Sequence, residues 1–282
     1  VEGSERRESK GASVASRRVY LFRTRVRRTA SRGNLTVTMP STDAAGLTTH
    51  FDRFRRHIVG IDAVVPTPDG ERPLIYADWT ASGRMYQPIE RRLSDVIGPF
   101  VANTHSEASA TGALMTEAYH EAHAIIRQHV NAGPDDVVIT AGSGMTAVVN
   151  KLIRMLGLRV PEQLQRYTQV PAEARPVVFV THMEHHSNQT PWIETIADVE
   201  VLSPDEDGLV DPESLRERLH AYRDRTVKIG AFTACSNVTG ICTPIHTLAR
   251  LMHEAGGVCF ADYAASGPYV PIDMHPAEPG AH

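Results

Sequence analysis

Four polar segments of this sequence each follow a short apolar run and carry groups that can do chemistry. They are residues 141–146, residues 182–186, residues 236–237 and the single acid Asp262. Glycines let a backbone approach an anion, imidazoles stack on flat rings or bind metals, an amide can bond an oxygen, and a buried carboxylate needs a partner. Each segment also has an ordinary structural explanation.

The first segment, Ala-Gly-Ser-Gly-Met-Thr, lies between an expected strand and an expected helix. Its backbone N–H groups at Gly144 and Met145, with the Thr146 hydroxyl, are suited to a phosphate at a helix start. A plain strand–helix turn explains the glycines equally well. The spacing excludes a Walker loop and a G-x-G-x-x-G fingerprint, and Ser143 lacks the flanking glycines of a nucleophile elbow.

The second segment contains three histidines, His182, His185 and His186. They are compatible with a metal site, with one imidazole stacked on a flat cofactor, or with a polar surface loop. No second ligand cluster is obvious in the sequence, and a strand end gives no regular i,i+4 face. All three interpretations stay open from these residues alone.

An amide and an acid complete the set. Asn237 follows an apolar strand, where its side chain can bond a phenolic oxygen or serve as a turn residue. Asp262 follows four apolar residues and is expected to be buried, so it needs a partner such as a pyridinium nitrogen. Capping of the next turn is the alternative for Asp262.

Short apolar runs alternate with amphipathic segments from about residue 44 onward. This pattern predicts an α/β fold with three layers, helices covering both faces of a mostly parallel central sheet. In such sheets ligands bind at the carboxyl ends of the strands, where the four polar segments would meet. We expect strands at 74–78, 137–140, 177–180, 199–202, 227–233 and 257–262, and helices at 47–58, 86–98, 113–131, 145–157, 189–197, 212–223 and 244–255.

Composition excludes several classes of protein. A net charge of -4 gives no field for nucleic acid or an anionic membrane, and no apolar run is long enough to cross a bilayer. Three cysteines in 282 residues do not suggest a disulfide framework, so we expect a reducing cytoplasm. Residues 1–43 are predicted to be a flexible basic extension, and residues 44–282 a single large domain.

Five stretches, taken together and in order, resemble the class V aminotransferase and cysteine desulfurase family, among the fold-type I pyridoxal-phosphate (PLP) enzymes. The resemblance covers about residues 74–275. The stretches are Tyr76-Ala-Asp-Trp-Thr-Ala-Ser82, Gly142-Ser-Gly-Met-Thr-Ala-Val-Val-Asn150, Glu184-His-His-Ser-Asn-Gln-Thr-Pro-Trp192, Ser236-Asn-Val-Thr-Gly240 and Asp262-Tyr-Ala-Ala265.

The resemblance implies a role for each segment. Residues 144–146 would bind the phosphate of PLP, and His185 would stack on the pyridine ring and help to move protons. Asn237 would bond the phenolic oxygen, and Asp262 would pair with the pyridinium nitrogen. The family also implies a homodimer, an amino-acid substrate and, for a desulfurase, a sulfur acceptor protein.

Two departures from the family are visible. Desulfurases often carry Gln at the place of Ala265, and the family's Schiff-base lysine lies in a Ser-x-His-Lys motif. The lysines of this chain are Lys10, Lys151 and Lys228, and none matches that motif. We therefore expect a fragment that ends before the lysine, with the PLP-binding large domain incomplete, the C-terminal small domain absent and the chain inactive alone.

The expected function is a PLP-dependent enzyme, cysteine desulfurase-like, which would cleave a C–S bond. An aminotransferase of the same family is the alternative. Two rivals come from other classes. One is a metal-dependent hydrolase built on His182, His185 and His186, and the other is a non-catalytic binding protein.

Overall fold

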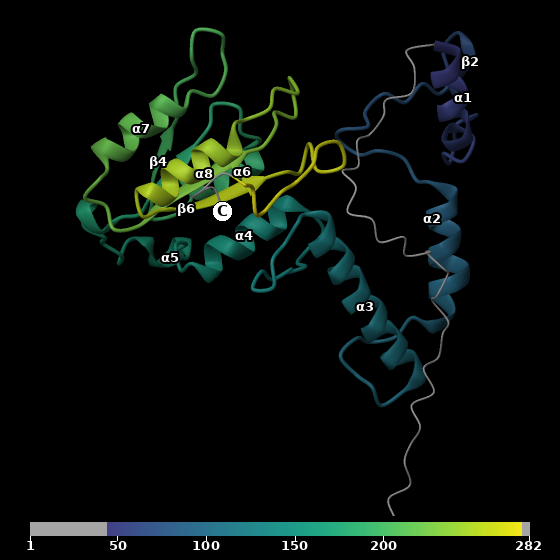
Figure 1. Cartoon of the computed structure of the whole chain (residues 1–282), viewed down its shortest axis with the longest axis horizontal. Coiled ribbons are helices and arrows are strands. Elements are labelled where there is room, and N and C mark those ends of the chain that lie inside the picture. The colour runs from purple at the N-terminus through teal and green to yellow at the C-terminus, as the bar shows by residue number, and fades with distance from the viewer. Residues whose placement is uncertain (1–43, 278–282) are drawn as a thin grey trace, which may run out of the picture. The chain divides into compact units, whose positions relative to one another are not determined.

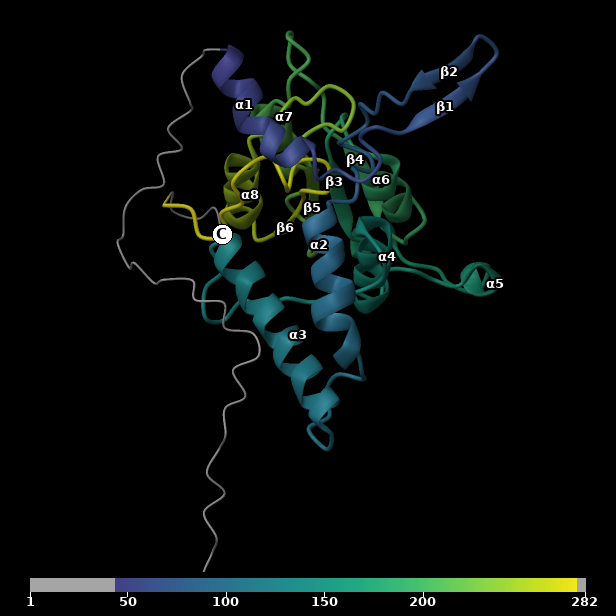
Figure 2. The same ribbon diagram turned by 90° about the vertical axis from the view of Figure 1, so that its right-hand side faces the viewer.

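A parallel sheet of four strands forms the centre of the protein. The computed structural model describes residues 44–277 (Figure 1). Its sheet has the order β4-β3-β5-β6 with every pair parallel (Figure 2). The strands are β3 (Val177–Val180), β4 (Asp198–Val201), β5 (Lys228–Thr233) and β6 (Val258–Asp262). All four lie within one or two residues of the predicted strands, which confirms these predictions.

The register of the strands brings their carboxyl ends to one edge. Val180 is paired with Ala231 across β3 and β5, and Thr233 is paired with Asp262 across β5 and β6. The polar segments that follow β3, β5 and β6 therefore leave the sheet from the same edge, where open α/β sheets bind their ligands.

Helices cover both faces of the sheet, as the sequence predicts. Along β3 the side chains alternate, so that Val177 and Phe179 enter one apolar cluster and Val178 and Val180 enter the other. The first cluster is completed by α7 (Pro212–Ala221) and α8 (Ile245–Glu254), the second by α4 (Met145–Met155) and α6 (His186–Ile193). Both views show α4 and α8 on opposite sides of the strands (Figures 1 and 2). The three-layer α/β prediction is confirmed.

The remaining elements precede the sheet or connect its parts. A hairpin of two antiparallel strands, not predicted from the sequence, lies between the first two helices. The predicted helix at 86–98 forms as an α-helix that continues into π and 3₁₀ turns. The elements are α1 (Ala44–Arg55), β1 (Val64–Thr67), β2 (Gly70–Pro73), α2 (Gln87–Arg91) with its continuations Arg92–Ile97 and Gly98–Phe100, α3 (Ala110–His129), α5 (Glu162–Gln165) and the 3₁₀ turn Ala172–Ala174.

Two predicted strands do not form. Residues 74–78 and 137–140 are irregular, and the exposed fractions of Ile75, Val137 and Ile139 are 88%, 75% and 60%. A strand needs a neighbour for its backbone hydrogen bonds, and among residues 44–277 these segments have none. The apolar run alone was therefore a misleading signal.

The helix predicted at 189–197 begins earlier, at His186. The prediction placed Pro191 in the first turn, where proline is best tolerated. In the structure His185 caps the helix and accepts a hydrogen bond from the Ser187 N–H, so Pro191 falls in the second turn. Because the helix begins at His186, His185 is its N-cap residue.

The predicted basic extension at 1–43 and the end of the predicted domain at 278–282 lie outside the described residues. None of the helices formed by residues 44–277 combines the length and the apolar character needed to span a membrane.

An ion-pair cluster joins the strands at the edge opposite the polar segments. Arg225 donates to the Asp198 carboxylate at 2.7 Å and to the Arg175 carbonyl at 2.6 Å, and Arg175 also pairs with Asp198 at 3.2 Å. The Arg225 side chain is only 16% exposed, so its charge is partly desolvated. This cluster fixes the starts of β3, β4 and β5.

We expect Arg225→Ala to lower the free energy of unfolding by about 2 kcal/mol, between the values for exposed and for buried ion pairs. Urea unfolding followed by circular dichroism measures this. Arg216→Ala, which removes an exposed pair with Glu213, is the control and should change stability by less than about 0.5 kcal/mol. Equal effects of both substitutions would contradict the role given to the cluster.

Candidate functional site

Asp262, the last residue of β6, is a nearly buried acid with an incomplete set of partners. It is 5% exposed, and one carboxylate oxygen accepts a hydrogen bond from the Ala264 N–H at 2.8 Å. The other oxygen has no hydrogen-bond partner among residues 44–277. Burial raises the pKa of Asp262, while the Ala264 N–H and the charge of a protonated His185 act to lower it. A cationic ligand group would satisfy this carboxylate.

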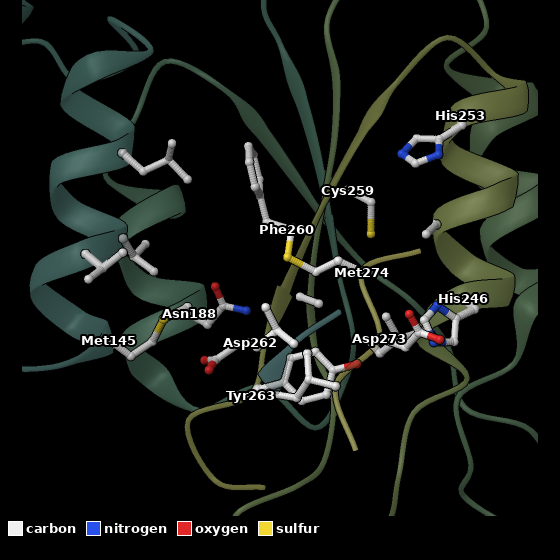
Figure 3. Close-up of a pocket in the computed structure, with 18 of the residues that line it drawn as sticks. Met145, Asn188, His246, His253, Cys259, Phe260, Asp262, Tyr263, Asp273 and Met274 are labelled. Carbon is white, nitrogen blue, oxygen red and sulfur yellow. The ribbon is translucent and has the colours of Figure 1, made fainter. Parts of the chain in front are cut away.

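The Asp262 carboxylate opens into a mostly apolar cavity of about 440 Å³. In Figure 3 it points toward the side on which Met145 and Asn188 lie, whereas Asp273 lies at the other side of the cavity. A cavity of this size, apolar with a few polar groups, suits a small organic ligand. Its other lining residues are Val130, Val148, Val149, Leu152, Trp192, Ile245, His246, Ala249, His253, Cys259, Phe260, Ala261, Tyr263, Ile272 and Met274.

The glycine-rich segment ends at the first turn of α4. Gly144 is the N-cap residue, and no side chain caps this helix. Neither the Met145 N–H nor the Thr146 N–H has a hydrogen-bond partner among the described residues. These donors, together with the positive end of the helix dipole, form a place for an anion beside the Met145 side chain that lines the cavity.

The two glycines of this segment differ in what a side chain would meet. Gly142 has φ +63°, and a Cβ there would lie 2.3 Å from the Ala147 Cβ. At Gly144 a Cβ would meet no atom within 4 Å. Gly142→Ala should therefore lower the free energy of unfolding by about 2 kcal/mol, and Gly144→Ala by less than about 0.5 kcal/mol.

Urea unfolding of the two alanine variants in parallel tests this expectation, and each variant serves as the other's control. If Gly142→Ala unfolds at the wild-type urea concentration, the segment does not need its left-handed glycine.

His185 stands at the start of α6 with an exposed ring. Its Nδ1 accepts a hydrogen bond from the Ser187 N–H at 3.2 Å and lies 2.8 Å from the Ser187 Oγ. In the neutral ring the proton is therefore on Nε2. His185 follows β3 and Asp262 ends β6, so both lie at the carboxyl edge of the parallel sheet.

The three histidines do not converge on a common point. His182 Nε2 bonds the Gly208 carbonyl at 3.0 Å, and the ring centroids of His185 and His186 are 6.2 Å apart. Within the part of the chain that the structure describes, no group of three or more His, Cys, Asp or Glu side chains is placed to hold a metal ion. The hydrolase alternative therefore has no support from the geometry.

Asn237 lies on the loop after β5, next to β6 in the sheet, but it does not line the cavity. Its side chain is exposed. The buried Ser236 organises this loop, because its hydroxyl accepts hydrogen bonds from the N–H groups of Val238 and Thr239, both at 3.2 Å. Of the predicted site residues, Met145 and Asp262 line the cavity, whereas Gly144, Thr146, His185 and Asn237 do not.

Glu184 is a residue of this region that the sequence analysis did not single out. Its Oε1 accepts hydrogen bonds from the Thr181 hydroxyl at 2.7 Å, the Thr181 N–H at 3.2 Å and the Thr233 N–H at 2.8 Å. Its Oε2 accepts one from the Asn188 amide at 2.8 Å. Burial raises the pKa of Glu184 although these bonds act to lower it. The carboxylate joins the ends of β3 and β5 to α6, and the Thr-x-x-Glu spacing was its signal.

Neither lysine in the described part of the chain lies at this edge. Lys151 is an exposed residue of α4. Lys228 begins β5, at the end of the strand opposite to Thr233, and its Nζ donates to the Arg225 carbonyl at 2.6 Å.

Sequence comparison identifies the family, since residues 75–278 match the sequence model of the aminotransferase class-V family. The chain belongs to this family. The match includes the segments that carry Thr146, His185, Asn237 and Asp262. It confirms the resemblance found from the motifs.

Several relatives are cysteine desulfurases. A probable cysteine desulfurase of Halalkalibacterium halodurans is 26% identical over 207 residues, which make up 72% of this chain and 47% of that protein. A cysteine desulfurase of Synechococcus elongatus is 30% identical over 207 residues, 72% of this chain and 30% of that protein. The chain thus spans half or less of the length of these relatives.

Solved structures show the same fold. The apo cysteine desulfurase of Thermococcus onnurineus NA1 has a TM-score of 0.60 at 18% identity, covering 79% of this chain and 50% of that one. A cysteine desulfurase of Escherichia coli has a TM-score of 0.56 at 23% identity, covering 78% and 50%. These likenesses support the fold-type I α/β domain.

Proposed function

We propose that this domain binds PLP and that the whole protein uses it to transform an amino acid. The observation that carries the proposal is Asp262, a nearly buried carboxylate with one unpartnered oxygen in an apolar cavity beside the uncapped start of α4. A pyridinium N–H fits the carboxylate, and a phosphate fits the helix start. Both groups belong to PLP.

Each candidate residue has a defined task in this proposal. The N–H groups of residues 144–146 and the Thr146 hydroxyl bind the phosphate, and Asp262 holds the proton on the ring nitrogen. His185 packs its exposed ring against the pyridine and moves protons through Nε2. Asn237 donates its amide to the phenolic oxygen. Its exposed position on a loop next to β6 is compatible with that task.

Bound PLP supplies an electron-withdrawing ring that stabilises negative charge on the substrate carbon. The protein contributes the ionised Asp262, which keeps the ring nitrogen protonated, and a mostly apolar cavity around it. The proposed reaction is removal of sulfur from cysteine, because the relatives are named cysteine desulfurases. Ala265, where desulfurases often have Gln, weakens the assignment to a desulfurase. Amino-group transfer is the second candidate.

The two reactions give different products. The whole protein, supplied with PLP, L-cysteine and dithiothreitol as the two-electron reductant, should form alanine and release sulfide without an added 2-oxo acid. An aminotransferase would instead require a 2-oxo acid and convert it to an amino acid. Absence of both products, with PLP bound, would contradict the proposed enzymatic function.

His185→Ala should change the absorbance spectrum of bound PLP, because the ring would lose its stacked imidazole. We expect the affinity for PLP to fall by about tenfold, a loss of about 1.4 kcal/mol. The matched control is His186→Ala, the neighbouring exposed histidine. An unchanged spectrum in His185→Ala would remove the stacking role.

The proposal includes a homodimer in the cytoplasm and, for a desulfurase, a sulfur acceptor protein. Large exposed apolar side chains support an interface, among them Ile75 at 88% and Val101 at 69% exposure. Sedimentation of the purified protein tests the dimer, and a monomer at micromolar concentration would contradict it.

A further inference from the structure

Cys235 and Cys242 face each other across a short antiparallel bridge in the loop between β5 and α8. Two backbone hydrogen bonds flank the pair. The N–H after Cys242 donates to the carbonyl before Cys235 at 3.0 Å, and the N–H after Cys235 donates to the carbonyl before Cys242 at 2.9 Å. This pattern makes the cysteines a non-hydrogen-bonded pair of an antiparallel ladder.

The backbone of such a pair meets the geometric requirement of a disulfide. Its Cα atoms lie about 4.5 Å apart and its side chains project from the same face. Disulfides span Cα separations of about 4.4–6.8 Å. Cys235 and Cys242 can therefore be joined without displacement of the backbone.

The two thiols also interact in the reduced protein, in which all three cysteines are free. Burial raises the pKa of Cys235, and the neighbouring Cys242 thiol raises it further. Cys242 is exposed, whereas Cys235 is partly buried. The bridge therefore pairs an accessible thiol, Cys242, with a less accessible one, Cys235. In such a pair the exposed thiol can attack an oxidant and the second thiol can then displace the product.

We propose that Cys235 and Cys242 are a reversible disulfide site, whose oxidation closes the loop of residues 235–242. Disulfide formation does not depend on the proposed function, because it needs only the two thiols and an oxidant. Because the loop carries Asn237, the bond would restrain the backbone on which that residue stands.

Oxidation needs a disulfide of low molecular weight, such as oxidised glutathione. The Cys242 thiolate attacks it, forms a mixed disulfide and releases one glutathione thiolate. The Cys235 thiolate then attacks the Cys242 sulfur, and the second glutathione thiolate leaves. The protein loses two electrons and two protons, and one oxidised glutathione becomes two reduced glutathione molecules.

Cys259 provides an internal comparison. It lies in β6 and lines the cavity of Figure 3, where burial raises its pKa to about 12. A thiol of this kind reacts slowly with an oxidant. Oxidation should therefore consume two of the three thiols and leave Cys259 reduced.

The test uses the purified wild-type protein, equilibrated with glutathione buffers of increasing oxidised fraction. Each sample is quenched in acid and unfolded, and its free thiols are then alkylated. Free thiols should fall from three to one in a single transition that dithiothreitol reverses. Trypsin cleaves after Lys228 and Arg250, so both cysteines lie in one peptide, which should lose about 2 Da as two hydrogens leave. The peptide with Cys259 should remain alkylated.

Three serine variants complete the experiment. Cys259→Ser should still form the disulfide, whereas Cys235→Ser and Cys242→Ser should not. Three free thiols at every buffer composition would overturn the proposal, as would a stable glutathione adduct on Cys242 or a disulfide-linked pair of chains. Because thiols and masses are measured on wild type, the result does not depend on the folding of a variant.

Discussion

Asp262→Asn is expected to weaken the binding of PLP by at least about tenfold. The substitution replaces a charge-assisted hydrogen bond to the ring nitrogen by a neutral one, and bonds of the charged kind contribute about 1.5–3 kcal/mol. In the whole protein kcat should fall by about 10²–10³, because the charge acts on the reacting state. Calorimetric titration with PLP measures the affinity, and product release measures kcat.

Asp273→Asn is the matched control for this prediction. Asp273 lines the same cavity, but its carboxylate already accepts hydrogen bonds from the Asn131 amide at 2.7 Å and the His275 N–H at 3.0 Å. Its substitution should leave PLP affinity within about twofold of wild type, a difference of about 0.4 kcal/mol. Inorganic phosphate should bind wild type and Asp262→Asn equally. Normal turnover in Asp262→Asn would show that the ring-nitrogen assignment is wrong.

The raised pKa of Asp262 should make the affinity for PLP depend on pH. Only the ionised carboxylate attracts a pyridinium, so PLP affinity should decline as the pH falls through this pKa. Because burial raises the pKa, the decline should begin at a higher pH than an ordinary aspartate would give. Asp262→Asn should lack this component of the pH profile.

Glu184→Ala is expected to lower the free energy of unfolding by about 3 kcal/mol. The substitution leaves the N–H groups of Thr181 and Thr233 and the Asn188 amide without the acceptor they share, and each unsatisfied buried donor costs about 1–3 kcal/mol. Glu184→Gln keeps one oxygen for the threonines but turns an amide toward Asn188, so its cost should be about 1 kcal/mol. Urea unfolding measures both variants.

The raised pKa of Glu184 predicts how the free energy of unfolding changes with pH. The folded protein holds the proton of this acid to a higher pH than the unfolded chain does. The stability it contributes is therefore fully present below the unfolded pKa and is lost as the pH rises through the folded pKa. The advantage of wild type over Glu184→Gln should shrink with rising pH. If the stability difference between wild type and Glu184→Gln grows with rising pH, Glu184 is not a buried, desolvated acid.

The sequence predicted the sheet well where strands are buried on both faces. The apolar runs of β3 and β5 contribute side chains to both cores, so their pattern reflects their environment. Residues 137–140 have the same kind of run, yet they have no strand beside them among the described residues. Pairing depends on segments distant in sequence, which a local pattern does not report.

Only part of the candidate site was predictable from the sequence, again because some of its contacts join segments that are distant in the sequence. Asp262 and Met145 were recognisable because they end or follow regular elements, and the structure places both at one cavity. Glu184 acts by accepting a hydrogen bond from the Thr233 N–H on another strand, whereas Ser236 bonds N–H groups of its own loop. The partner of Glu184 is set by the folded arrangement of the strands, so the sequence alone does not identify Glu184 as a positioning residue.

A crystal structure of the protein soaked with PLP is the most direct test of the proposed site. We predict the phosphate at the N–H groups of residues 144–146 and the pyridine nitrogen within hydrogen-bonding distance of the Asp262 carboxylate. PLP bound at another surface, or in this cavity with its ring nitrogen turned away from Asp262, would contradict the account.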